Sequence, residues 1–168
     1  MQKHIFITNG VGGCGKDTFA FYMKANISTM KYSSIDEIKK AATHCGWHGG
    51  KTEKDRKFLS DLKLLATEYS DAPFNAMKRT VDLFYTLPYS VLLIDIREPE
   101  EIDRAKKEFG AKTILIRNDR VAPIESNMAD ANVENYDYDF VIENNGTLED
   151  LRKTVCKFID ENIKERNN

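Results

Sequence analysis

The sequence predicts an α/β fold, in which a mostly parallel sheet of five strands lies between helices in three layers. Short apolar runs, each followed by polar or glycine-rich residues, alternate with longer segments whose apolar residues recur at helical spacing. Several of the apolar runs are continuous, as in strands of a parallel sheet that are buried on both faces. The 168 residues allow one substantial core, and we expect a single domain over residues 1–168.

Each expected strand is a short run with many apolar residues. The run from Val91 to Ile94 ends in Asp95 and is typical of a central parallel strand. The run from Ser28 to Tyr32 is short and is a weak strand candidate. The expected strands are residues 4–8, 28–32, 91–95, 113–116 and 139–142.

Helices are expected between the strands, and each begins where the residue types favour a helix start. These starts are Lys16, the capping-box spacings Ser34–Glu37 and Thr52–Asp55, Ser70 or Asp71 before Pro73, Glu98 before Pro99, and Thr147. Apolar residues at helical spacing should face the core. They are Phe19, Ala20, Met23, Ile35, Ile38, Ala42, Phe58, Leu62, Leu65, Tyr69, Phe74, Met77, Val81, Phe84, Ile102, Ala105, Phe109, Leu148, Leu151, Val155, Phe158 and Ile159.

The stretch from Ile5 to Ala20 carries the strongest functional signal. Gly10 and Gly15-Lys16 have the G-x-x-x-x-G-K spacing of a phosphate-binding loop, or P-loop. The glycines allow successive backbone N–H groups to point at an anion, and the following helix adds the positive end of its dipole. We therefore expect a nucleotide to be bound by Gly10, Gly12, Gly13, Cys14, Gly15, Lys16, Asp17 and Thr18.

The residue after the lysine departs from the usual motif. Asp17 stands where Ser or Thr is usual, and Thr18 follows it. A carboxylate beside a triphosphate is tolerated only when a cation lies between them, so Asp17 indicates a bound Mg²⁺. Asp95, at the end of a strand, is the third candidate ligand, although an acid in that place could also cap a turn.

Four polar segments directly follow expected strands. They are the P-loop, Asp95 to Arg97, Arg117 to Arg120, and Asn144 to Gly146. Parallel strands end at one edge of the sheet, and ligands of such folds bind there. The sequence therefore predicts that these segments converge on one site.

Composition argues against several other classes of partner and site. The formal net charge of −2 gives no reason to expect nucleic acid or a membrane surface as a partner. The scattered cysteines Cys14, Cys45 and Cys156 fit a reducing cytoplasm better than a disulfide scaffold. The segment from His44 to Gly50 holds two histidines and one cysteine, too few for structural zinc, so we expect a loop there.

The sequence resembles the P-loop kinases of small phosphorylated metabolites, and among them the deoxynucleoside monophosphate kinase-like group. Gly15-Lys16-Asp17-Thr18 is similar to that group's P-loop, in which Asp commonly follows the lysine. Asp95-Ile96-Arg97, with Pro99 and the acids around it, resembles the group's Asp-x-Arg strand end. Weaker similarities lie in residues 34–39, 56–59 and 144–151, so that the resemblance covers nearly the whole chain.

This resemblance implies a three-layer P-loop NTPase fold and ATP–Mg²⁺-dependent phosphoryl transfer to a small phosphorylated acceptor. A nucleoside or deoxynucleoside monophosphate is the favoured acceptor. The acceptor would bind in a helical region at about residues 34–87, and a short lid-like loop would lie at about residues 117–135. The candidate catalytic residues are Lys16, Asp95, Arg97, Arg117 and Arg120, and the candidate metal ligands are Asp17, Thr18 and Asp95. The nucleotide base would be bordered by Asn145 and Gly146. The acceptor would be bound by Asp36, Lys39, Arg56 and Arg97.

Other interpretations stay open from the sequence. The acceptor could be dephospho-coenzyme A or phosphomevalonate, and the chain could be a nucleotide-binding regulatory module without turnover. Arg56 could be a solvated surface residue, and Asp36 with Lys39 could form a plain ion pair on a helix surface. A GTPase is not favoured, because Arg117-Asn118-Asp119 lacks the Asn-Lys-x-Asp guanine signature.

Overall fold

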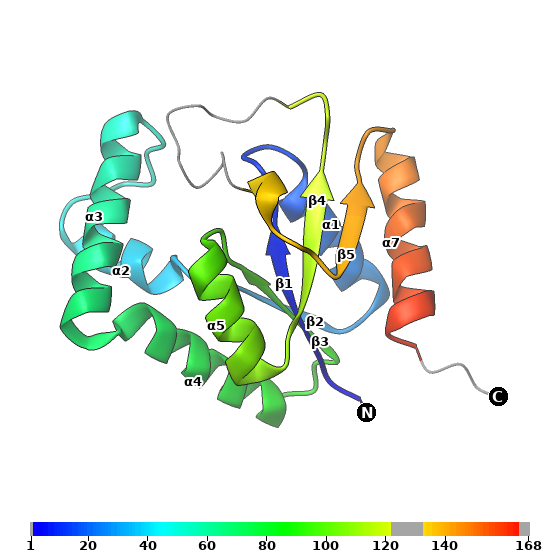
Figure 1. Ribbon diagram of the computed structural model, residues 1–168, viewed down its shortest axis with the longest axis horizontal. Coiled ribbons are helices and arrows are strands. Elements are labelled where there is room, and N and C mark those ends of the chain that lie inside the picture. Colours follow the sequence, from blue (N-terminus) through cyan, green and yellow to red (C-terminus); the bar gives the residue numbers. More distant parts are fainter. Residues whose placement is uncertain (1, 122–132, 165–168) are drawn as a thin grey trace.

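One parallel five-stranded sheet forms the centre of the molecule (Figure 1). The computed structural model describes residues 2–121 and 133–164. The strand order is β2-β3-β1-β4-β5, and every pairing is parallel. The strands are β1 His4–Asn9, β2 Thr29–Ser33, β3 Val91–Asp95, β4 Lys112–Arg117 and β5 Phe140–Glu143. The expected parallel sheet is confirmed.

Helices cover both faces of this sheet and complete the three layers (Figure 1). Helices α1 and α7 pack together on one face, whereas α4 and α5 supply the buried side chains on the other. The described helices are α1 Lys16–Asn26, α2 Asp36–His44, α3 Glu53–Ser70, α4 Ala72–Thr86, α5 Pro99–Phe109, the 3₁₀ turn η1 Val133–Asn135, and α7 Leu148–Asn162. None of these helices is long and apolar enough to cross a membrane.

The alternation of side chains along the strands divides the core into two clusters. Phe6 and Leu93 point to the face covered by α1 and α7, whereas Ile7, Leu92 and Ile94 point to the face covered by α4 and α5. These five side chains are at most 2% exposed. Because each buried side chain of this size stabilises the fold by about 1.5–3 kcal/mol, the sheet is held rigidly and fixes where its strands end.

The expected helix starts are confirmed except the one at Ser34. Thr52 and Thr147 form the expected capping boxes, in which each hydroxyl accepts from a backbone N–H three residues later. The box expected at Ser34 is wrong: α2 begins at Asp36, whose carboxylate accepts the Ser33 N–H at 2.9 Å. Asp71 is the N-cap of α4 and Pro73 lies in its first turn, as expected, but the Asp71 carboxylate binds Arg104 at 2.5 and 2.9 Å instead of capping a backbone N–H.

The inward stripe expected for α3 is wrong in its second half. Leu65 and Tyr69 are 62% and 91% exposed, and the buried residue is Leu59. The reason is that the apolar contacts of α3 are mainly with α2 and α4, around a small cluster with Ile38, and not with the sheet. Leu148, expected to face inward, is likewise exposed in the first turn of α7.

Candidate active site

The expected segments converge at one edge of the sheet, here called the carboxyl edge, where β1, β3, β4 and β5 end (Figure 1). Hydrogen bonds tie the segments together. The Asn9 side chain donates to the Arg97 carbonyl at 3.2 Å, and Arg120 donates to the Gly146 carbonyl at 3.0 Å. The lid-like loop expected at 117–135 begins at this edge, but residues 122–132 lie outside the described residues.

Glycines give the P-loop its tight path between β1 and α1. Gly10, Gly13 and Gly15 have positive φ angles of 150°, 84° and 108°. The N–H of Gly10 donates to the Asn9 side chain at 2.8 Å, and Gly15 directly precedes α1. The loop thus ends at the N-terminus of a helix, where N–H groups and the helix dipole favour an anion.

Asn144, just after β5, holds the last turn of the P-loop. Its side-chain amide donates to the Cys14 carbonyl at 2.8 Å, and its backbone N–H donates to the Arg117 carbonyl at 2.7 Å. A Cβ at Gly15 would collide with the Asn144 amide, so glycine is required there by contact as well as by φ. The sequence singled out Asn145 and Gly146 in this turn but not Asn144; its place directly after a strand was the available signal.

The Lys16 ammonium lies over the P-loop itself. Its Nζ donates to the carbonyls of Gly10 and Val11, the latter at 3.0 Å, and lies 3.8 Å from the sulfur of Cys14. Phosphate oxygens bound by this loop would therefore meet a cation that is already in place. Burial raises the pKa of Cys14 despite this nearby ammonium, so the thiol stays protonated and is no nucleophile at neutral pH.

The two acidic metal candidates meet at a lysine that the sequence analysis missed. Lys31, in β2, places its Nζ 2.5 Å from Asp17 and 3.1 Å from Asp95. The Thr8 hydroxyl donates to the other oxygen of Asp95 at 2.5 Å. A lysine in the middle of an expected strand was the signal, because a charge in a covered strand needs a partner.

Lys31 favours the charged forms of this group. Its hydrogen bond and its charge lower the pKa of Asp17. Burial alone would lower the pKa of Lys31, but the two carboxylates outweigh it and raise that pKa. Asp17 and Lys31 are therefore both charged at neutral pH.

Asp17, Asp95 and Thr18 offer the kinds of oxygen ligand that suit Mg²⁺. Carboxylate and hydroxyl oxygens are the ligands that Mg²⁺ prefers, and the lysine shows that the space between Asp17 and Asp95 accepts a cation. Thr18 lies half-buried in the first turn of α1. Within residues 2–121 and 133–164, no three His, Cys, Asp or Glu side chains form a metal cluster, so phosphate and water oxygens would complete the coordination.

Arg97 lies two residues after the end of β3 and is half-buried at the same edge. Asn9 fixes its backbone by donating to its carbonyl at 3.2 Å, and the same amide donates to the Tyr138 hydroxyl at 2.9 Å. The position of Arg97 is thus tied to the end of β1, from which the P-loop starts.

The other acceptor candidates lie on α2 and α3. The Asp36 carboxylate accepts the Ser33 N–H, so it closes the turn between β2 and α2. Lys39 is exposed on α2. Arg56 is exposed near the start of α3.

Arg117 and Arg120 are both engaged in contacts within the protein. Arg117 binds Glu134 at 2.7 and 3.0 Å and Glu143 at 3.2 Å, and this pairing raises its pKa. Arg120 donates to the Gly146 carbonyl, as described above. Both arginines therefore brace the loops after β4 and β5 in this state.

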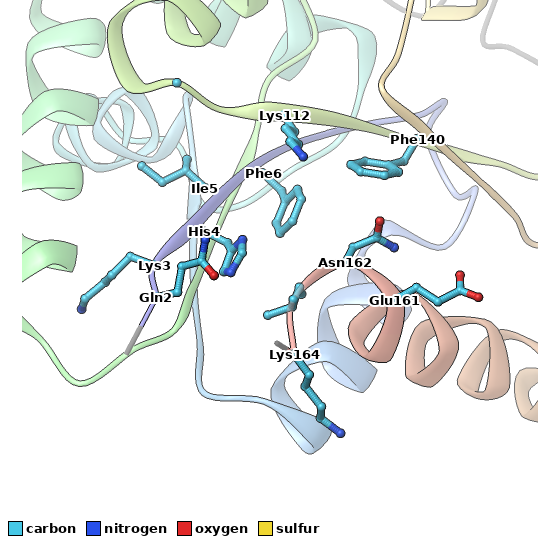
Figure 2. A pocket seen from close by; sticks show the side chains of 12 residues that line it. Gln2, Lys3, His4, Ile5, Phe6, Lys112, Phe140, Glu161, Asn162 and Lys164 are labelled. Atoms are coloured by element: carbon cyan, nitrogen blue, oxygen red, sulfur yellow. The ribbon is translucent and has the colours of Figure 1, made fainter. Parts of the chain in front are cut away.

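A hollow of about 400 Å³ lies at the opposite end of the strands (Figure 2). Its lining includes His4, Lys112, Phe140 and Asn162, which belong to the beginnings of β1, β4 and β5 and the end of α7. Burial and the Lys112 charge lower the pKa of His4. The hollow contains none of the residues of the carboxyl edge, so it is not part of the site.

No family model matches the sequence, and no curated protein matches it. Solved structures of similar shape do exist. Dephospho-CoA kinase from Campylobacter jejuni has a TM-score of 0.54 at 17% identity, over 95% of this chain and 97% of that one. TT1252 from Thermus thermophilus has a TM-score of 0.52 at 15% identity, over 98% of this chain and 100% of that one.

Thymidylate kinase from Candida albicans has a TM-score of 0.50 at 11% identity, over 96% of this chain and 92% of that one. At such low identities the likeness shows the fold alone. The chain has the three-layer α/β fold of P-loop kinases, and the expected fold class is confirmed.

Proposed function

We propose that the protein transfers a phosphoryl group from ATP–Mg²⁺ to a small phosphorylated acceptor, with a nucleoside or deoxynucleoside monophosphate as the favoured substrate. One observation carries the proposal. A glycine loop with Lys16 and the carboxylates Asp17 and Asp95 meet at the carboxyl edge, at the end of the central strand β1 and its neighbour β3. Phosphoryl transfer depends on such positioning and charge neutralisation more than on covalent chemistry.

The P-loop would bind the donor. Its N–H groups and the N-terminus of α1 would hold the phosphates. The Lys16 ammonium would move its hydrogen bonds from the loop carbonyls to oxygens of the β- and γ-phosphates. Asp17, Thr18 and Asp95 would hold Mg²⁺ directly or through water, and the metal would neutralise phosphate charge. Asn145 and Gly146 would border the base, in a turn anchored by Arg120 and by the hydrogen bond from the Asp119 N–H to Asn145 at 2.8 Å.

The acceptor would arrive beside Arg97, in the helical region at about residues 34–87. A guanidinium binds a phosphate through two parallel hydrogen bonds, and the fixed backbone of Arg97 limits where those bonds point. Lys39 and Arg56 are exposed on the helices of this region, and Asp36 shapes its first turn. The dephospho-CoA and thymidylate kinases of the same fold, by their names, act on nucleotide-like acceptors, which supports an acceptor of this class.

Arg117 and Arg120 would reach a transferring phosphoryl group only after leaving Glu134, Glu143 and the Gly146 carbonyl. We propose that a catalytic role for either arginine requires this exchange of partners. Mutation of Glu134 would then change turnover without changing ATP affinity.

A coupled assay with ATP–Mg²⁺ tests the function against a panel of nucleoside monophosphates, deoxynucleoside monophosphates, dephospho-coenzyme A and phosphomevalonate. We expect turnover with a monophosphate and its loss in Lys16→Ala, whereas Lys24→Ala, which removes an exposed lysine from the last turn of the same helix, should leave it unchanged. Turnover only with dephospho-coenzyme A or phosphomevalonate would move the acceptor to that class. Tight ATP binding without turnover would indicate a regulatory module, and unchanged ATP affinity in folded Lys16→Ala would refute the P-loop assignment.

A further inference from the structure

Lys31 holds the space between the two acidic residues of the site. Its ammonium lies 2.5 Å from Asp17 in α1 and 3.1 Å from Asp95 at the end of β3. These two carboxylates come from different elements, and the lysine in β2 joins them. Neither the P-loop motif nor the strand-end motif includes this residue.

The strand register explains why the lysine reaches the site. Ser33 is paired with Asp95, and Lys31 is paired with Leu93, so Lys31 lies one side-chain repeat before the acid on the same face of the sheet. Leu93 belongs to the cluster beneath α1, which shows that this is the face that carries α1. The long stem of Lys31 can therefore run along the sheet to its carboxyl edge and place the charge beside the start of α1.

The pair of Lys31 and Asp95 is more shielded from water than the ion pairs on the helix surfaces, whereas the Asp17 side chain is exposed. The side chains of Lys31 and Asp95 are 20% and 21% exposed, whereas those of Lys57 and Asp61 are 74% and 56% exposed. Charges interact more strongly where water is partly excluded. A cation that enters between Asp17 and Asp95 must displace the ammonium or share the carboxylates with it.

We propose that Lys31 is an internal counter-ion that occupies the cation position of Asp17 and Asp95 until a metal–nucleotide complex arrives. Free divalent metal binds weakly to the empty protein because the lysine competes for the same carboxylates. A nucleotide removes this barrier, since its phosphates offer the displaced ammonium a new anionic partner. The inference rests on the proposed function, in that it assigns the metal of the donor nucleotide to Asp17 and Asp95.

The test measures Mn²⁺ binding to the nucleotide-free protein by electron paramagnetic resonance, with Mn²⁺ as the probe for Mg²⁺. Lys31→Met, which keeps an unbranched stem and removes the charge, should bind Mn²⁺ at least about tenfold more tightly than the unmodified protein. Lys31→Arg should stay close to the unmodified protein. Lys157→Met, which removes an exposed lysine 3.9 Å from Glu161 on α7, is the matched control and should have no effect.

A double variant identifies the site of the added binding. In Lys31→Met/Asp95→Asn the gain in Mn²⁺ affinity should disappear, because one of the two carboxylates is then neutral. An unchanged or weaker affinity in Lys31→Met would overturn the proposal, and so would a gain that persists in the double variant. Thermal melts followed by circular dichroism establish that each variant is folded.

The unmodified protein gives a second measurement that needs no variant. Its Mn²⁺ affinity should rise at least about tenfold when a non-hydrolysable ATP analogue is present, and equal affinities with and without the analogue would refute the competition. Absence of turnover with every acceptor would refute the proposed function but leave the nucleotide-free Mn²⁺ result standing. The two proposals therefore fail separately.

Discussion

Replacement of Gly10 by Ala tests the geometry of the P-loop most directly. Gly10 has a φ of 150°, and a Cβ there would lie less than 3.0 Å from both the Ile116 carbonyl oxygen and the sulfur of Cys14. The oxygen belongs to the backbone of β4, and the Cys14 side chain is fully buried, so neither neighbour can move without displacing the structure around it.

Two costs add in Gly10→Ala. An L-residue held at such a φ costs about 1–3 kcal/mol, and relief of the overlap in a packed interior costs about a further 1–3 kcal/mol. We expect a loss of roughly 2–6 kcal/mol in the free energy of unfolding, a large part of the 5–15 kcal/mol typical of whole domains. Because the overlap pushes the loop away from β4, the folded fraction should also bind ATP more weakly.

Gly13→Ala is the matched control within the same loop. Gly13 also has a positive φ, of 84°, but a Cβ there would meet only the Val121 side chain at 3.8 Å, an ordinary contact. Only the backbone cost of about 1–3 kcal/mol remains. Urea denaturation gives the stabilities, and calorimetry on the folded protein gives the ATP affinities. If Gly10→Ala is no more destabilising than Gly13→Ala, the close approach of the P-loop to β4 is wrong.

Three further predictions concern charges. Arg97→Ala should spare ATP binding but lower kcat/KM for the acceptor about a hundredfold or more. Arg97→Lys should restore kcat/KM only in part, because an ammonium lacks the planar fork. A loss of ATP affinity with unchanged acceptor kinetics would instead place Arg97 in the donor site. Asp17→Ala should weaken binding of Mg·ATP more than of metal-free ATP, and equal losses in calorimetry would reduce Asp17 to a helix-start residue. Burial alone would raise the pKa of Asp139, but hydrogen bonds from the Thr113 N–H and hydroxyl at 2.7 and 2.8 Å outweigh it and lower that pKa. The lowered pKa stabilises the fold above the unfolded value of about 3.9, and this contribution is lost as pH falls through the folded value. Asp139→Asn should therefore cost about 1 kcal/mol at pH 7 in urea unfolding and less as the pH is lowered below about 3.9, and a cost that is the same at every pH would contradict the argument.

The sheet was predictable from the sequence because its strands are buried on both faces. A run such as Val91 to Ile94 has no solvent side, so its apolar pattern reports the fold directly. Helix α3 was harder, since apolar residues recur all along it while only Leu59 is buried. Which of several apolar residues a helix buries depends on its partners, and α3 packs on two helices instead of the sheet. The start of α2 was missed because the Asp36 carboxylate caps a turn upstream of its helix.

The site was predictable to the extent that strand ends reveal it. A parallel sheet brings the P-loop, Asp95, Arg97 and the turn after β5 to one edge whatever the side-chain details. The partners of those residues were not predictable, because they come from distant elements: Lys31 from β2, and Asn144 from 130 positions beyond the Cys14 carbonyl that it binds. The two glutamate partners of Arg117 were not predictable either, because they lie in η1 and β5 and reach Arg117 only in the folded structure.

The departure of the P-loop at Asp17 and the presence of Lys31 explain each other. A hydroxyl in place of Asp17 would leave the ammonium of Lys31 with Asp95 as its one anionic partner in this group. The Asp17 side chain is 96% exposed, so its pairing adds at most about 1 kcal/mol to stability. Its larger effect is on the charge at the carboxyl edge, where the two carboxylates and the lysine together present one negative charge instead of two. A polyphosphate that binds at this edge, as proposed above, would therefore be repelled less than two bare carboxylates would repel it.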